Sequence, residues 1–286
     1  KYLFVVMYAD NQGEGGIMAL MALAFPNSKE KHNSSMMFLS LLGLFGAALL
    51  YGDGVITPAI TVLSATEGLA TLNPLLSGYS VSLTIGILIL LFGVQRYGTA
   101  KIGVIFGPIM LVWFFVIAAL GLNQVVQNPA VLKAINPLWA IDFVQTNPRM
   151  AFIALASVFL VATGAEALYA DMGHFGRRPI KLAWIFIALP ALLLNYFGQG
   201  ALLLKDFSLV NDPFFQLAPR SLLIPLVVLA TLAAVIASQA LISGVFSLTQ
   251  QAVQLGFSPR LLVLHTSKSE IGQIYIPAIN WALMTV

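Results

Sequence analysis

The stretch Leu50-Tyr51-Gly52-Asp53-Gly54-Val55-Ile56-Thr57-Pro58-Ala59 carries a carboxylate inside a segment that is otherwise apolar. Residues 36–49 before it and 62–72 after it are mostly hydrophobic, which predicts a membrane-spanning helix with Asp53 deep inside it. A carboxylate at bilayer depth is energetically expensive, so we interpret Asp53 as a functional residue. The alternative is a kinked helix whose polar stripe only packs against other helices.

A polar stripe extends from Asp53 along the same predicted helix. Its members are spaced by four, four, three and three residues, so a regular helix places them on one face. They are Asp53, Thr57, Thr61, Ser64 and Glu67. Each supplies oxygen atoms that can bind a cation or accept a proton. Pro58 has no N–H to donate to the carbonyl of Gly54, so we expect a bent helix with a free oxygen beside Asp53.

The composition predicts a polytopic membrane protein. Of the 286 residues, 59% are hydrophobic and 9% are charged, and the mean hydropathy is +0.91, which exceeds what a water-soluble domain of this size can bury. The lack of cysteine excludes disulfides and thiolate metal sites. A net charge of +3 gives no sign of nucleic-acid binding. Because the sequence starts at Lys1 and stops within an apolar run, we expect an internal fragment of a longer protein.

Hydrophobic runs predict the order of the membrane spans. These are expected at residues 35–70, 78–94, 102–122, 150–170, 180–204 and 221–248, with a further one beginning near Ile276. The run from Ile17 to Phe25 is too short to cross, and we expect an interfacial helix or a part of the protein core. Residues 123–147 contain two Asn-Pro turns and Trp139, which predicts a surface loop with short helices.

Lysine and arginine are divided unevenly between alternate loops. One set of loops holds Lys29, Lys31, Arg96, Lys101, Arg177, Arg178, Lys181, Arg260 and Lys268. The other set holds Lys133, Arg149, Lys205 and Arg220. Because cytoplasmic loops carry the excess of basic residues, the first set is predicted to be cytoplasmic. The first complete span then runs from the inside to the outside.

A second polar cluster lies near the end of the span expected at 150–170. Thr163, Glu166 and Tyr169 are three residues apart and share one face of a regular helix. Gly164 makes local unwinding inexpensive, and discontinuous helices with polar groups near mid-membrane form the ion and substrate sites of many secondary transporters. The alternative is that Glu166 only pairs with a nearby basic residue such as Arg177 or Arg178.

Other polar side chains within the spans have the character of groups that join helices. They are Asn195 and Gln199, and the stripe Gln239, Ser243 and Ser247. We expect them to form hydrogen bonds between helices, with the lining of a transport pathway as the alternative.

The charges within the spans favour a cation as the transported species. Asp53, Glu67 and Glu166 are the carboxylates within or at the ends of the predicted spans, whereas no lysine or arginine lies in the middle of one. Negative charge with hydroxyl and carbonyl oxygens, and no nitrogen or sulfur ligands, suits a hard cation. A carboxyl group in an apolar environment also holds a proton more tightly, which allows proton carriage. The residues alone therefore predict a cation transporter, with proton coupling left open.

Five motifs resemble those of the Kup/HAK/KT potassium-uptake permeases. They are Tyr51-Gly-Asp-Gly-Val-Ile-Thr-Pro-Ala-Ile-Thr-Val-Leu-Ser-Ala-Thr-Glu-Gly-Leu69, Ala9-Asp-Asn-Gln-Gly-Glu-Gly-Gly-Ile17, Gly164-Ala-Glu-Ala-Leu-Tyr-Ala-Asp-Met-Gly-His-Phe-Gly176, Asn195-Tyr-Phe-Gly-Gln-Gly-Ala-Leu-Leu204 and Ile236-Ala-Ser-Gln-Ala-Leu-Ile-Ser-Gly-Val-Phe-Ser-Leu248. They occur in the family's order along the full length, and the bacterial members are the most similar.

This resemblance implies an all-α membrane domain with the LeuT-like inverted-repeat fold of amino acid and polyamine permeases. Residues 1–286 would run from the end of helix 2 to the start of helix 9, with the first helix and a C-terminal cytosolic domain absent. The implied function is uptake of K⁺ together with H⁺ across the plasma membrane, which is the inner membrane in bacteria. Neither a cofactor nor an enzymatic activity is implied, and a homodimer is left open.

The resemblance also assigns site residues. Acidic residues implicated in transport in the family match Asp53 and Glu166. Thr57, Thr163 and Tyr169 are weaker matches as K⁺ ligands, and Glu67 is a secondary candidate. The transported K⁺ is expected in the region of Asp53 and Thr57.

Two other functions stay open. The first is a K⁺ channel or uniporter, although the sequence has no Thr-Val-Gly-Tyr-Gly filter, and a proton flux accompanying K⁺ would separate symport from it. The second is a permease for amines or amino acids on the same fold, because a fold does not determine a function. Competition of K⁺ uptake by Rb⁺ but not by amines would distinguish these. A membrane enzyme is less consistent, since neither a nucleophile–base pair nor a metal-ligand cluster stands out.

Overall fold

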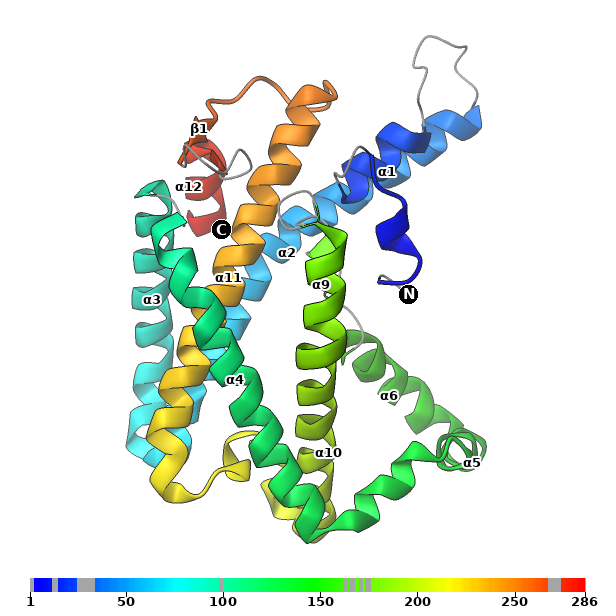
Figure 1. The fold of residues 1–286 in the computed structure, drawn as a ribbon, viewed down its shortest axis with the longest axis vertical. Coiled ribbons are helices and arrows are strands. Elements are labelled where there is room, and N and C mark those ends of the chain that lie inside the picture. Colours follow the sequence, from blue (N-terminus) through cyan, green and yellow to red (C-terminus); the bar gives the residue numbers. More distant parts are fainter. Residues whose placement is uncertain are drawn as a thin grey trace. The chain divides into compact units, whose positions relative to one another are not determined.

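The computed structural model describes residues 3–11, 15–24, 34–97, 100–161, 164, 168–169, 172, 176–266 and 274–285. The described part is almost entirely helical (Figure 1). Its α-helices are α1 (Ile17–Ala24), α2 (Ser34–Leu72), α3 (Ser80–Val94), α4 (Ala100–Gln127), α5 (Leu138–Thr146), α6 (Pro148–Val161), α9 (Arg177–Ala183), α10 (Leu189–Lys205), α11 (Leu223–Gln254) and α12 (Pro277–Thr285).

Short elements connect these helices. They are the 3₁₀ turns η1 (Val6–Tyr8), η2 (Pro74–Tyr79), η3 (Gln95–Tyr97), η4 (Pro129–Ile135), η6 (Phe207–Asn211), η7 (Phe215–Leu217) and η8 (Arg220–Leu222), and a π-helical turn, η5 (Trp184–Ala188), between α9 and α10. The strands β1 (Leu264–His265) and β2 (Ile274–Tyr275) pair antiparallel, with Leu264 opposite Tyr275 and His265 opposite Ile274.

Four helical segments of the described residues are long and apolar enough to cross a membrane. They are Met37–Leu72, Ile105–Gln127, Arg177–Lys205 and Arg220–Gln254. These correspond to the spans predicted at 35–70, 102–122, 180–204 and 221–248. Two shorter apolar helices, Ser80–Val94 and Pro148–Phe159, lie where the spans at 78–94 and 150–170 were predicted. The chain is therefore a multi-pass membrane domain, as the composition predicted.

The surface segment predicted at 123–147 is partly different. Helix α4 continues to Gln127, so residues 123–127 are helical although the apolar run has already ended. The remainder forms the short helices η4 and α5, as expected. The short apolar run after Gly16 forms α1, whose Met18 and Met21 are buried, so it is part of the protein core rather than an isolated interfacial helix.

The described fold consists of two compact units. Unit 1 contains residues 1–110, 166–181 and 227–286, and unit 2 contains residues 111–165 and 182–226. In unit 1, α2 packs against α3 and α11, and α3 packs against α12 (Figure 1). The largest side chain at the centre of this core is Phe246 on α11, which is 1% exposed and meets the Tyr275 ring edge-on at 5.8 Å.

A glycine allows α2 to approach α11 closely. A Cβ atom at Gly54 would lie 2.6 Å from Cγ2 of Val245, which is too short for any real contact. Val62, eight residues further along the same face, is fully buried. Because this face of α2 packs against the core, the opposite face carries the polar stripe.

Unit 2 is organised around the crossing of α4 and α10. A Cβ atom at Gly198 on α10 would overlap the backbone of Gly121 on α4, so the two helices touch through their main chains. Beyond the crossing, Asn128 donates from Nδ2 to the carbonyl of Ala201 at 3.1 Å. Val125, Val131 and Ala201 form a small buried cluster beside this bond. The ends of α4 and α10 are thereby joined.

Candidate functional site

Asp53 lies at the midpoint of α2, 19 residues after Ser34 and 19 residues before Leu72. At about 1.5 Å per residue, it is roughly 28 Å from either end of the helix. A helix of this length exceeds the thickness of the hydrocarbon core, so a helix centred on the bilayer would hold Asp53 near the middle of the membrane. The depth predicted from the sequence is consistent with this position.

Hydroxyl groups follow Asp53 along one face of α2. The Thr57 hydroxyl donates to Oδ1 of Asp53, and the Thr61 hydroxyl donates to the carbonyl of Thr57 at 2.6 Å. Asp53, Thr57, Ser64 and Glu67 are exposed and Thr61 is half-buried, whereas Gly54, Pro58 and Val62 are buried. The prediction that the polar stripe shares one face is confirmed. Helix α2 is continuous through Pro58. The free Gly54 oxygen beside Asp53 stays a prediction.

Asp53 is exposed within the described residues, and the burial of this carboxylate in an ion pathway stays a prediction. The Asp53 side chain is exposed because the core of unit 1 packs on the other face of α2. Within the described residues, the stripe therefore presents two carboxylates, Asp53 and Glu67, and several hydroxyl oxygens on an exposed helix face. No group of three His, Cys, Asp or Glu side chains gathers as a metal centre in the part of the chain that the structure describes.

The second predicted site falls only partly on described residues. Thr163 and Glu166 lie outside them, so their surroundings are not described. Gly164 is non-helical and has a φ of 93°, a left-handed conformation that glycine adopts easily. Helix α6 ends at Val161, and the non-helical Gly164 is consistent with the local unwinding that glycine makes inexpensive.

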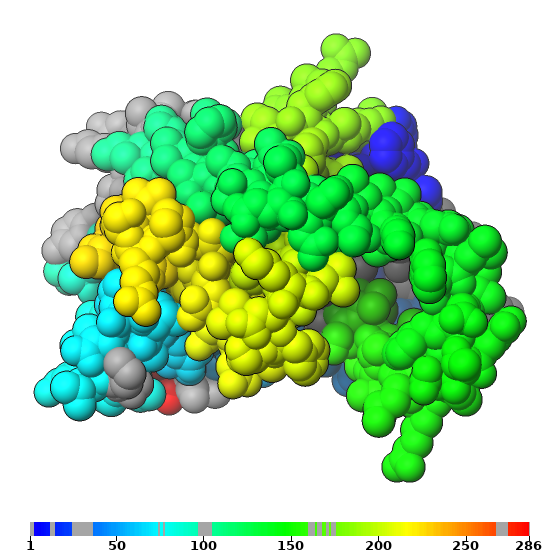
Figure 2. All heavy atoms as spheres, turned by 90° about the horizontal axis from the view of Figure 1, so that it is seen from below, coloured from blue at the N-terminus to red at the C-terminus, as the bar shows by residue number. Residues whose placement is uncertain are grey.

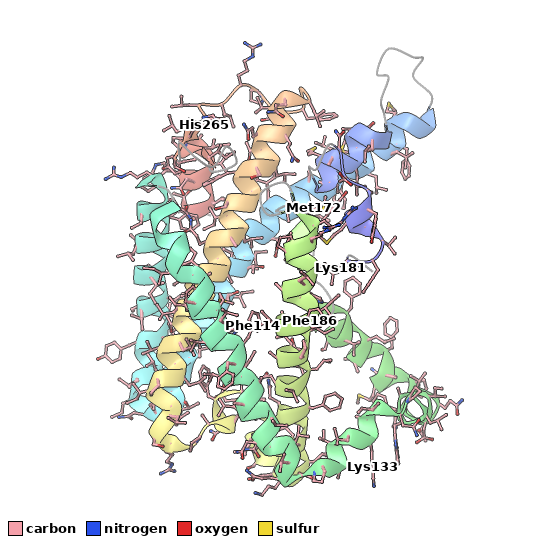
Figure 3. The ribbon with its side chains drawn as sticks, in the orientation of Figure 1. Phe114, Lys133, Met172, Lys181, Phe186 and His265 are labelled. Atoms are coloured by element: carbon pink, nitrogen blue, oxygen red, sulfur yellow. The ribbon has the colours of Figure 1, made fainter. Side chains whose placement is uncertain are left out.

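Tyr169, the third residue of that site, is buried within unit 1. Its hydroxyl donates to the carbonyl of Ala9 at 2.5 Å, and its ring packs with Met7, Met172 and Ile180. A Cβ atom at Gly15 would overlap the Tyr169 carbonyl, so only glycine fits there. Figure 3 shows Met172 beside the N-terminal segment. The structure thus places Tyr169 as a link between residues 3–11 and α9. Its role as a K⁺ ligand stays a prediction.

Arg177 has a partner other than the one considered in the sequence. Its Nη1 lies 3.8 Å from Oδ1 of Asp10, and its guanidinium lies 4.4 Å from the centre of the Tyr8 ring. Lys181 lies 4.6 Å from the centre of the Phe4 ring. The ion pair is long and partly exposed, so it contributes little to stability. The alternative pairing of Arg177 with Glu166 involves a residue outside the described set.

The buried polar contacts of unit 1 include a residue that the sequence did not suggest. Gln95 and Gln239 exchange two amide hydrogen bonds, of 2.8 and 2.7 Å, and are 5% and 7% exposed. Gln239 was predicted to join helices, which is confirmed, but Gln95 stands beside Arg96 at the end of an apolar run and looks like a boundary residue. The sequence signal that could have identified Gln95 is its amide side chain directly after that apolar run. These amides are structural and lie on the core side of the helices.

Several of the other expected helix-joining groups form hydrogen bonds within their own helices. Gln199 donates to Oδ1 of Asn195 at 2.6 Å inside α10, and the Ser247 hydroxyl donates to the carbonyl of Ser243 at 3.2 Å inside α11. Nδ2 of Asn195 is buried without a hydrogen-bond acceptor. The prediction that Asn195 and Gln199 join helices is therefore wrong for the described contacts. The main-chain contact of Gly121 with Gly198 joins α4 to α10 instead.

Comparisons with known proteins agree with the motifs and the helical pattern. The whole sequence, residues 1–286, matches the family described as the K⁺ potassium transporter integral membrane domain. It is 59% identical over 286 residues to a probable potassium transport system protein Kup of Myxococcus xanthus, covering 99% of this chain and 44% of the relative. It is 61% identical over 285 residues to one of Nitrosomonas eutropha, again covering 99% and 44%.

A third relative gives the same result. The probable potassium transport system protein Kup of Paraburkholderia xenovorans is 57% identical over 286 residues, which are 100% of this chain and 45% of the relative. The chain thus spans less than half the length of these curated relatives. No solved structure matches it. Because the family model matches residues 1–286, this chain belongs to the family of K⁺ potassium transporter integral membrane domains.

Proposed function

We propose that this chain forms part of a transporter that takes up K⁺ across the plasma membrane, coupled to H⁺, with Asp53 and Glu166 in the ion pathway. The observation that carries the proposal is the placement of Asp53 at the midpoint of α2, where it accepts a hydrogen bond from Thr57 and faces away from the core of unit 1. Membership in a transporter family and the names of the relatives support K⁺ as the substrate and argue against an enzyme.

The chemistry of the stripe supports cation passage. Asp53 supplies the negative charge, and Thr57 supplies a hydroxyl oxygen one turn away, which together replace part of the hydration shell of K⁺. Thr163 and Tyr169 are proposed as further oxygen ligands and Glu67 as a secondary acidic group. Uptake of one positive charge gains about 2.3 kcal/mol per 100 mV of inside-negative potential, and a co-transported proton would roughly double that drive.

The proposal includes a fold and an assembly. We infer the LeuT-like inverted repeat, in which these residues run from the end of helix 2 to the start of helix 9. The multi-pass pattern and the non-helical Gly164 after the end of α6 support this fold, since broken helices carry the sites of such transporters. A homodimer in the bacterial inner membrane is part of the same proposal.

Complementation in a strain that lacks its own K⁺ uptake systems tests the proposal. The sequence is expressed within the full-length transporter, with Asp53→Asn, Asp53→Glu and Glu166→Gln beside the parent. Growth on low K⁺, Rb⁺ uptake and internal pH are recorded. Loss of a charge-assisted contact of about 1.5–3 kcal/mol predicts a roughly 10- to 100-fold lower uptake for Asp53→Asn, with partial activity for Asp53→Glu. Asp142→Asn, which removes an exposed carboxylate on α5, is the matched control.

The outcomes separate the alternatives. Loss of both uptake and K⁺-dependent acidification in Asp53→Asn and Glu166→Gln supports carboxylate-based symport. Uptake without acidification in the parent supports a uniporter, and competition by amines supports an amine permease. If both variants take up Rb⁺ and acidify as the parent does, these carboxylates are packing residues and the proposed pathway is wrong.

A further inference from the structure

Unit 2 carries an open groove of about 560 Å³ between the η4–α5 segment and the end of α10. Val131, Lys133, Ala134 and Trp139 line one side, and Gly200 and Phe207 line the other. Its volume falls within the roughly 300–1,000 Å³ typical of small-molecule sites. The walls are made of hydrocarbon, including the aliphatic stem of Lys133. The groove therefore suits an apolar chain and offers few groups that could orient a polar ligand inside it.

The groove lies where two membrane spans end. The span Ile105–Gln127 and the span Arg177–Lys205 both end beside it, and the Asn128–Ala201 hydrogen bond of 3.1 Å holds these two ends together. Figure 2 shows this end of unit 2, with η4 and α5 in green and the residues after α10 in yellow. Span ends lie at the boundary between acyl chains and headgroups, where tryptophan is enriched. Trp139 is thus placed at headgroup depth.

The groove is uncovered within the described residues. Trp139 is 58% exposed, Leu204 64% and Phe207 73%. Large apolar side chains exposed on a membrane domain are available to an apolar partner. At the edge of a bilayer, the acyl chains of the surrounding lipids are the available apolar partner.

One of the residues that line this groove, Lys133, is a cation. Lys133 contributes its stem to the wall and is exposed at its end, and Figure 3 shows its side chain extending outward from the end of the fold. Long basic side chains bury their methylene groups and keep the ammonium in the headgroup layer. The ammonium is complementary in charge to a lipid phosphate. An apolar groove with one cation at headgroup depth matches a glycerophospholipid in both of its parts.

We propose that this groove holds one acyl chain of a membrane glycerophospholipid, with the lipid phosphate beside the ammonium of Lys133. By the distribution of basic residues, Lys133 lies on the side opposite to the cytoplasm, so the lipid belongs to the outer leaflet. A chain seated here bridges η4 and the end of α10, and so stabilises the joined ends of two spans. This inference does not depend on which ion is transported.

Fluorescence quenching of Trp139 tests the site directly. The full-length protein is delipidated in detergent after Trp113, Trp184 and Trp281 are replaced by Phe, so that Trp139 is the remaining tryptophan of the four in this chain. Any tryptophans elsewhere in the full-length protein are replaced in the same way. Phosphatidylglycerol with brominated acyl chains is the probe. We expect quenching that saturates at one lipid per chain.

Three variants distinguish a built site from non-specific contact. Lys133→Gln is expected to weaken binding about fivefold by removing one cation near the phosphate. Ala134→Phe fills the groove and should abolish saturable quenching. Arg149→Gln removes an exposed cation of the same unit outside the groove and should bind as the parent does.

Two results would overturn the proposal. One is quenching that rises linearly with lipid, or that is the same in the parent, Lys133→Gln and Ala134→Phe. The other is a delipidated protein that associates through this groove, seen as a larger mass that Ala134→Phe reduces, because the occupant would then be a second copy of the chain. Native mass spectrometry of the same samples counts the retained lipids and measures the mass of any larger assembly.

Discussion

The reciprocal amide pair of Gln95 and Gln239 provides a quantitative test of how unit 1 is held together. Replacing Gln239 with Leu removes both hydrogen bonds, of 2.8 and 2.7 Å, and leaves the Gln95 amide in a site where it is 5% exposed. A buried polar group without a partner costs about 1–3 kcal/mol. We therefore expect Gln239→Leu to lower the free energy of unfolding by about 2 kcal/mol.

The double variant carries the decisive information. With Gln95→Leu and Gln239→Leu together, two apolar side chains of similar size face each other and no buried polar group lacks a partner. Most of the lost free energy of unfolding should therefore be recovered. Hydrogen bonds between membrane helices contribute about 0.6 kcal/mol on average and up to about 1.7 kcal/mol each. Two of them predict a coupling free energy of about 1–3 kcal/mol between these positions.

Unfolding in mixed micelles of mild detergent and SDS measures this coupling. The parent, both single variants and the double variant are compared, with Gln127→Leu as the control for an exposed glutamine on α4. The control should change stability by less than about 0.5 kcal/mol, as surface substitutions usually do. If the effects of the two single variants simply add in the double variant, the amides do not stabilise each other and the reasoning is refuted.

Two further predictions concern unit 2. Gly198→Ala would force α4 and α10 apart, because its Cβ overlaps the backbone of Gly121, and should lower the free energy of unfolding by about 1–3 kcal/mol in the same assay. The control is Gly107→Ala on α4, where no atom lies within 4 Å of the added Cβ. Equal effects of the two substitutions would contradict the close crossing. Asp206 accepts hydrogen bonds from the hydroxyl and the backbone N–H of Ser208, at 2.7 and 2.9 Å, which lower the pKa of its carboxyl group. Its contribution to stability is therefore present above the unfolded pKa and is lost as the pH falls through the lowered folded pKa. Asp206→Ala should lower the unfolding temperature at neutral pH and cease to do so in strong acid, and a pH-independent difference would show that the charge plays no part.

The sequence by itself determined the class of the protein and the placement of its helices. Apolar runs long enough to cross a bilayer can be recognised locally, which is why four predicted spans coincide with α2, α4, the α9–α10 segment and α11. The polar face of α2 followed from the same local rule, because residues three and four apart share a face of any α-helix. The Thr57–Asp53 hydrogen bond is a contact of this local kind.

Only the tertiary structure decided which polar groups meet and which face of α2 is covered. Gln95 and Gln239 are 144 residues apart, and Tyr169 lies 160 residues from Ala9. Hydropathy and helical periodicity describe how a residue relates to its own helix and carry no information about its partner on another. The exposure of Asp53 has the same origin, since Gly54 and Val62 direct the packing of α2 to the opposite face through contacts with helices distant in sequence. The crossing at Gly121 and Gly198 likewise depends on two main chains that approach only in the folded protein.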